Sequence, residues 1–117
     1  MPRKIKYTNQ YKRAFKRCMK RNNFPVKELK AIMQILVTRP FTYDEVYQHK
    51  VHKLEDSRKY KGCWELHIKN RNDDNLLVYQ LLGNSVKFED ILVEFEDVGT
   101  HSDLYGSIVD LDDIVCL

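Results

Sequence analysis

The chain has 117 residues, 43% of them hydrophobic, with a formal net charge of +3 and three cysteines. This length suffices for one hydrophobic core and not for two ordinary domains, and the cysteine spacing argues against a disulfide framework or a zinc ribbon. Because no run of 18 apolar residues occurs and the first ten residues lack the apolar part of a signal peptide, we expect a cytoplasmic protein without a membrane segment.

The first forty residues predict a strand followed by a helical hairpin. Residues 3–7 alternate in polarity, and Thr8 suits the N-cap of a helix that runs to about Asn22. Residues 26–38 predict a second helix, which Pro40 ends. Each helix has one apolar stripe, and these stripes require a sheet to cover them.

The helical hairpin is also strongly basic. Residues 1–40 contain twelve Lys or Arg and one acid, whereas residues 84–117 contain one Lys and nine Asp or Glu. A basic face of this density is typical of phosphate binding, although a solvated helix face that only keeps the protein soluble has the same composition. The candidate RNA- or ribosome-binding residues lie on the first helix: Lys12, Arg13, Lys16, Arg17, Lys20 and Arg21.

The second half of the chain predicts a sheet. Residues 41–62 show no sustained period and predict a long loop with at most one helical turn. Residues 63–82 form two strand patterns around an Asn/Asp-rich turn, and the second, residues 75–82, is apolar on both parities, as in a central strand. A third strand follows Ile91 and closes at Gly99, so the fold class is α+β with a small, mostly antiparallel sheet. The tail, residues 107–117, alternates acidic and apolar residues and suits a helical turn, an added strand or a partner-facing arm.

The four histidines supply the candidate chemistry. In the strand that begins at Trp64, period two places His67 on the face opposite Leu66, away from the core. Histidine titrates near neutrality, so a cluster at one rim of the sheet can supply both a general base and a general acid. The pair His49-x-x-His52 lacks a carboxylate or cysteine partner at helical spacing, so we expect neither a metal site nor a cofactor.

These features together resemble the RelE superfamily of bacterial toxins, and within it the YafQ-like branch. The resemblance spans residues 5–106 and is strongest over residues 62–82 and 95–106, where the second block reads FEDVGTHSDLYG. It implies one toxin domain over residues 1–106, followed by the extension 107–117. It also implies the RelE-like fold and an endoribonuclease that cuts messenger RNA in the ribosomal A site without a metal. The implied partners are an antitoxin, the ribosome with its mRNA, and operator DNA only through the antitoxin.

The resemblance also implies roles for particular residues. The 2′-hydroxyl of the RNA would attack the adjacent phosphate, with His101 as general acid and His67 paired with Asp74 as general base. His52 would bind phosphate or share proton transfer, and Tyr105 would stack on a base. Because the turn is about two residues longer than the common family pattern, Asp73 is an alternative to Asp74.

One position departs from the family pattern. Asp97 stands where the family commonly has an arginine that stabilises the transition state, and a carboxylate next to a phosphorane is repulsive. Lys69, on the same predicted strand face as His67, or Arg71, in the adjoining turn, can replace that charge as a substrate-binding residue. The alternative function is therefore a relative with weakened catalysis, which binds RNA or ribosomes and an antitoxin without cleaving.

Overall fold

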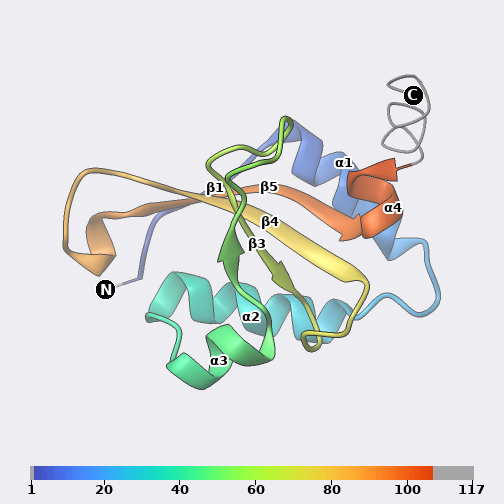
Figure 1. The fold of residues 1–117 in the computed structure, drawn as a ribbon, viewed down its shortest axis with the longest axis horizontal. Helices are drawn as coiled ribbons and strands as arrows, with labels where there is room; N and C mark the ends of the chain where they lie inside the picture. Colours follow the sequence, from blue (N-terminus) through green and yellow to red (C-terminus); the bar gives the residue numbers. More distant parts are fainter. Residues whose placement is uncertain (1, 107–117) are drawn as a thin grey trace.

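The computed structural model describes residues 2–106, which form a mixed five-stranded sheet with helices around it (Figure 1). The elements in chain order are β1 (Ile5–Tyr7), α1 (Asn9–Met19), α2 (Val26–Thr38), α3 (Tyr43–Gln48), β2 (His52–Lys53), β3 (Trp64–His67), β4 (Asn75–Leu82), the 3-10 helix η1 (Phe88–Asp90), β5 (Leu92–Thr100) and α4 (His101–Leu104). The strand order is β1-β5-β4-β3-β2, with β1 parallel to β5 and the other neighbours antiparallel. The predicted α+β class with a mostly antiparallel sheet is confirmed. The predicted extension, residues 107–117, lies outside the described residues.

Helices α1 and α2 cover one face of the sheet. The Thr8 side chain accepts a hydrogen bond from the Tyr11 backbone N–H, which confirms the predicted N-cap. Helix α1 ends at Met19, before the predicted Asn22, because the chain turns at Lys20 and carries the Arg21 side chain to a partner on α4. The second helix has the predicted bounds. The apolar stripes of both helices join strand residues in the main core, whose buried members are Tyr11, Ala14, Cys18, Leu29, Ile32, Leu36, Leu66, Ile68, Leu77, Tyr79, Val93, Phe95 and Val98.

Strand β4 lies at the centre of the sheet and is buried on both faces, as its sequence predicts. Leu77 and Tyr79 point into the main core, whereas Leu76 and Val78 belong to a smaller cluster on the opposite face. The smaller cluster is completed by Tyr60 and other residues from the segment before β3, and by residues of α4. The sheet therefore has a second covered face, and His67 is buried on it.

The loop predicted for residues 41–62 is wrong in part, because this segment contains α3 and β2. Helix α3 starts with a capping box, in which Thr42 and Glu45 each bond the other's backbone N–H. Strand β2 adds to the edge of the sheet by pairing His52 with Glu65. Among the described residues, no helix is long and apolar enough to cross a membrane.

A β-bulge in β5 sets which side chains reach the second face. Val78 pairs with Asp97 and Tyr79 with Phe95, so Glu96 is the extra residue. As a result Phe95 and Val98 both pack in the main core, and Asp97 points to the opposite face. One oxygen of the bulged residue, Glu96 Oε1, is buried without a hydrogen-bond partner.

Glu96 gives a pH-dependent contribution to stability. Burial, and then the neighbouring Glu94, raise the pKa of the Glu96 carboxyl to about 7. Because the folded pKa lies above the unfolded one, this contribution is fully present below pH about 4.5 and is lost as the pH rises through 7. We expect urea denaturation to show a larger loss of stability between pH 5 and pH 8 in the wild type than in Glu96→Gln. Identical pH profiles for the two proteins would contradict this assignment, and exposed Glu89→Gln provides the matched control.

Candidate active site

Three buried polar side chains share the second face of the sheet. Glu65 is 5% exposed, His67 6% and Asp97 4%, and among residues 2–106 these are the buried charged or histidine side chains. His67 does point away from α1 and α2, as period two predicts. The expectation that it therefore lies outside the packed interior is wrong, because the segment before β3 and α4 cover this face as well.

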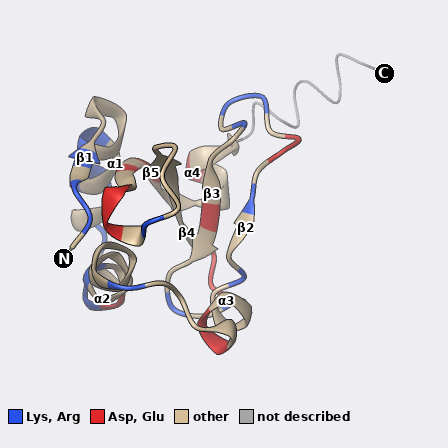
Figure 2. Ribbon diagram, turned by 90° about the vertical axis from the view of Figure 1, so that its left-hand side faces the viewer, with Lys and Arg blue, Asp and Glu red and all other residues tan. Residues whose placement is uncertain are grey.

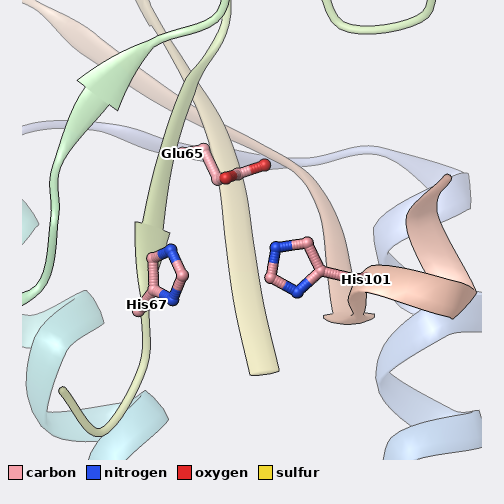
Figure 3. Close-up of side chains that lie close together, drawn as sticks. All are labelled: Glu65, His67 and His101. Carbon is pink, nitrogen blue, oxygen red and sulfur yellow. The ribbon is translucent and has the colours of Figure 1, made fainter. Parts of the chain in front are cut away.

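His67 and His101 face each other beside Glu65 (Figure 3). Their ring centroids are 5.8 Å apart, and one ligand atom from each of the three residues lies within 4.8 Å of the others. His67 and Glu65 come from β3, whereas His101 is the first residue of α4, directly after β5. Residues far apart in the sequence therefore meet at one point of the second face.

Each of these histidines is oriented through its Nδ1 atom. His67 Nδ1 lies 2.7 Å from the backbone carbonyl oxygen of Asp73, and His101 Nδ1 lies 2.6 Å from Asp74 Oδ1. Both partners are acceptors, so both Nδ1 atoms carry the proton and both Nε2 atoms are left for the site.

The expected pairing of Asp74 with His67 is wrong. Asn75 pairs with Thr100 across the sheet, so the preceding residue, Asp74, reaches His101 at the end of β5. The side chain of Asp73 instead accepts two hydrogen bonds within the turn, from the Lys69 backbone N–H and from the side-chain amide of Asn75. Asp74, and not Asp73, therefore provides the carboxylate that contacts a histidine.

Glu65 is a site residue that the sequence analysis missed. Its Oε2 accepts a hydrogen bond from the Tyr105 hydroxyl at 2.5 Å, and its Oε1 lies 3.6 Å from His52 Nε2. Burial, together with this hydrogen bond, raises the pKa of the Tyr105 hydroxyl, which therefore stays a donor. The alternation Glu65-x-His67 was the available signal, because residues two apart in a strand share a face. Two predicted site residues, His52 and Tyr105, thus meet at Glu65.

The Asp97 carboxylate is buried and accepts hydrogen bonds from three donors. The Tyr60 hydroxyl, Gln10 Nε2 at 2.6 Å and the Val98 backbone N–H at 2.9 Å all bond its carboxylate. Burial, and then the Asp97 contact, raise the pKa of Tyr60. The Tyr60 ring also packs edge-on against the Tyr105 ring, with the ring centroids 5.8 Å apart. Through its hydrogen bond to Asp97, Tyr60 attaches the segment before β3 to β5.

Helix α4, which carries His101, is anchored to the segment that follows α1. Arg21 bonds both carboxylate oxygens of Asp103 at 2.5 and 2.8 Å, and it is the main reason that the pKa of Asp103 is lowered. Gly99 permits this arrangement, because a Cβ there would lie 2.7 Å from Asp103 Oδ2.

The six basic residues predicted to bind RNA divide into two groups. Arg21 is committed to Asp103, and Arg17 lies 4.0 Å from the same carboxylate and donates to the Val98 carbonyl. The other four are exposed, three of them on α1 and Lys20 at its C-cap: Lys12, Arg13, Lys16 and Lys20. Figure 2 shows that basic residues also mark α2 and the connection between β2 and β3.

The remaining candidates lie at the margin of the site. Strand β3 ends at His67, so Lys69 is not on the strand face predicted for it and lies exposed in the turn. Arg71 donates to the Tyr47 carbonyl oxygen and stacks on the Tyr47 ring, which holds it against α3. The Nδ1 atom of His49 hydrogen-bonds the backbone carbonyl oxygen of His67 at 2.8 Å, so the His49 ring supports the backbone of β3.

Comparisons with known proteins identify relatives over almost the whole chain. The model of a family described as "Bacterial toxin of type II toxin-antitoxin system, YafQ" matches residues 3–106. The chain is 33% identical over 104 residues to the mRNA interferase toxin YafQ of Escherichia coli K12, covering 89% of this chain and 97% of that protein. The crystal structure of YafQ from E. coli BL21(DE3) matches with a TM-score of 0.67 and 28% identity, over 89% of this chain and 99% of that one. A crystal structure of the E. coli DinJ-YafQ toxin-antitoxin complex matches with a TM-score of 0.65 and 31% identity, over 91% and 100% of the two chains.

Proposed function

Because the chain belongs to the YafQ family of bacterial type II toxins, we propose that it is a cytoplasmic mRNA endoribonuclease that acts in the ribosomal A site. The toxin domain would span residues 1–106, with residues 107–117 as an acidic extension. The observation that carries the proposal is the convergence of His67 and His101 beside Glu65.

In this proposal the RNA supplies its own nucleophile. The 2′-hydroxyl attacks the neighbouring phosphorus and the bond to the 5′-oxygen breaks, which leaves a 2′,3′-cyclic phosphate and a 5′-hydroxyl. The protein has to accept one proton, donate another and stabilise the charge of the phosphorane. No metal is needed for these steps.

His101 is the general acid. The Asp74 carboxylate on its Nδ1 stabilises the imidazolium form, and a protonated Nε2 can then be donated to the leaving 5′-oxygen. This contact supports the acid role, although it assigns Asp74 to a different histidine from the one that the sequence suggests.

His67 is the general base. Its Nδ1 donates to a neutral carbonyl oxygen, so the neutral ring presents a lone pair at Nε2 that can accept the proton of the 2′-hydroxyl. Glu65 lies beside it and is oriented by Tyr105 and His52, so its negative charge favours the imidazolium that forms.

The charge of the phosphorane needs a cation near these groups. Asp97 does not oppose that charge directly, because its carboxylate is bonded to Tyr60, Gln10 and the Val98 backbone. Lys59 is one candidate, since its Nζ lies 5.1 Å from the ring centre of Tyr60, which packs against Tyr105. Lys69 on the neighbouring turn is the other candidate.

Two kinds of partner follow from the proposal. The complex of DinJ with YafQ supports an antitoxin that binds this chain, and operator DNA would be reached only through that antitoxin. The exposed basic residues of α1 would bind ribosomal RNA by phosphate contacts, which predicts ribosome binding that weakens as salt rises.

The alternative is a relative that binds ribosomes and antitoxin but does not cleave. Asp97 at the position of the family arginine is the observation that favours it. An active enzyme requires that another cation, such as Lys59, replaces this arginine.

Cleavage of mRNA on ribosomes with an empty A site is the direct test. We expect the purified chain to cut within the A-site codon and to leave a cyclic phosphate and a 5′-hydroxyl, as mapped by end-specific ligation. A matched mRNA with a 2′-deoxynucleotide before the scissile phosphate should stay intact, because it lacks the nucleophile. Intact normal mRNA on ribosomes that bind the protein would favour the alternative.

A further inference from the structure

Helix α3 carries two exposed aromatic side chains that do not pack in either core. Tyr43 is 88% exposed and Tyr47 is 61% exposed, and residues four positions apart lie on the same face of a helix. No residue of this six-residue helix is buried. Because short helices are marginal without packing of an apolar face, contacts other than core burial have to hold α3 in its place.

Polar contacts fix α3 beside the candidate catalytic strand. At its start, Arg39 bonds both carboxylate oxygens of Glu45, at 2.8 and 2.7 Å. At its end, the His67 backbone N–H donates to the His49 carbonyl oxygen at 2.7 Å, and the His49 ring bonds the His67 carbonyl oxygen. The exposed tyrosines are therefore held at a defined position relative to His67, the proposed general base.

Arg71 adds a positive charge to this aromatic surface. Its guanidinium carbon lies 4.3 Å from the centre of the Tyr47 ring, and it donates to the Tyr47 carbonyl oxygen at 2.9 Å. Within residues 2–106 no carboxylate forms an ion pair with Arg71, and Lys69 is exposed in the same turn. Unpaired RNA bases stack on tyrosine rings and guanidinium planes, and their phosphates pair with the nearby charges. The combination fits single-stranded RNA.

The strand order determines on which side of the catalytic pair this surface lies. His67 pairs with Leu76 of β4 along one edge of β3 and bonds His49 along the other edge. His101 follows β5, which lies beyond β4. Helix α3 is therefore on the side of His67 that faces away from His101.

We propose that Tyr43, Tyr47 and Arg71 bind the mRNA on the 5′ side of the scissile phosphate, by stacking on one of the two nearest bases and pairing with its phosphate. The direction rests on the proposed function. In that mechanism His67 takes the proton of the 2′-hydroxyl and His101 protonates the leaving 5′-oxygen, so the RNA upstream of the cut extends past His67. The three residues position the substrate and take no part in proton transfer.

Stacking can be measured on an mRNA that cannot be cut. The probe is a ribosome-bound mRNA with a 2′-deoxynucleotide before the scissile phosphate and 2-aminopurine at one of the two positions on its 5′ side. We expect the wild type and Tyr47→Phe to quench the 2-aminopurine fluorescence, and Tyr47→Leu to quench it far less. With 2-aminopurine on the 3′ side, all three proteins should give the same signal.

Absence of quenching on the 5′ side would overturn the inference and leave this surface to a protein partner. Equal quenching by the wild type and Tyr47→Leu would overturn it as well. Because the Tyr47 ring is exposed, Tyr47→Leu should keep the urea midpoint of the wild type, which separates lost stacking from lost folding.

A double-mutant cycle between protein and RNA gives a second test. Tyr47→Leu, or an abasic nucleotide at the quenched position, should each lower the cleavage rate of subsaturating mRNA about 5- to 100-fold. The two changes together should cause little further loss, because both remove the same stack, whereas Tyr47→Leu and an abasic nucleotide on the 3′ side should be additive.

The two assays separate this inference from the proposed function. Cleavage of normal mRNA with additive losses at the 5′ position would overturn the stacking role and leave the proposed function intact. Quenching that depends on Tyr47, without cleavage of normal mRNA, would contradict the proposed function and leave the RNA-binding surface standing.

Discussion

Replacement of His101 by alanine should reduce mRNA cleavage by about 10²- to 10⁴-fold, the usual contribution of one positioned acid or base. In the proposed mechanism His101 donates the proton to the leaving oxygen, and its Nδ1 atom is held by the Asp74 carboxylate. The rate of cleavage of ribosome-bound mRNA, measured under single-turnover conditions, is the appropriate quantity. Because the His101 ring is exposed at the start of α4, the free energy of unfolding should change little.

His49→Ala is the matched control for His101→Ala. Its ring supports the backbone of β3 and does not face the site, so cleavage should fall much less. Asp74→Asn should give an intermediate loss, since an amide oxygen still accepts from Nδ1 but carries no charge. Equal activity of the wild type and His101→Ala would refute the acid role.

Asp97→Arg should destabilise the fold by about 3–5 kcal/mol instead of restoring a catalytic cation. Asp97 is buried, and its carboxylate accepts from Tyr60 and Gln10. An arginine there would leave both donors without their acceptor and would place a larger, unpaired cation against them. Urea denaturation followed by circular dichroism measures the loss.

Asp97→Asn provides the comparison for that experiment. Its amide oxygen can still accept from Tyr60, so the loss of stability should be clearly smaller than for the arginine variant. An Asp97→Arg protein that is as stable as the wild type and cleaves faster would show that this position faces the RNA after all.

The sequence predicted the parts of the fold that local patterns determine. Apolar stripes located α1 and α2, and the two-sided apolar pattern of residues 75–82 identified β4 as the central strand with its correct bounds. For the region of α3 the sequence predicted one helical turn at most, because apolar residues are few there, although the Thr42-x-x-Glu45 capping box was present.

The contacts within the site could not be predicted in the same way. Which histidine Asp74 reaches depends on the register of β4 against β5, and that register shifts at the bulge. The burial of His67 depends on how the segment containing Tyr60 folds back over the sheet. That segment has no periodic pattern from which its path could be predicted. Glu65 was overlooked because glutamate in a strand usually faces solvent, and the sequence does not show that the second face of the sheet is covered.

The contacts of the second face join residues far apart in the sequence, and this fixes the order in which the site can form during synthesis. Asp97 bonds Gln10 across 87 positions and Tyr60 across 37, Glu65 meets Tyr105 across 40, and Asp74 meets His101 across 27. The two segments that complete the site, β5 and α4, are the last described elements to leave the ribosome. A nascent chain therefore lacks His101, the proposed general acid, until β5 and α4 have been made, so no earlier intermediate of synthesis contains the assembled site.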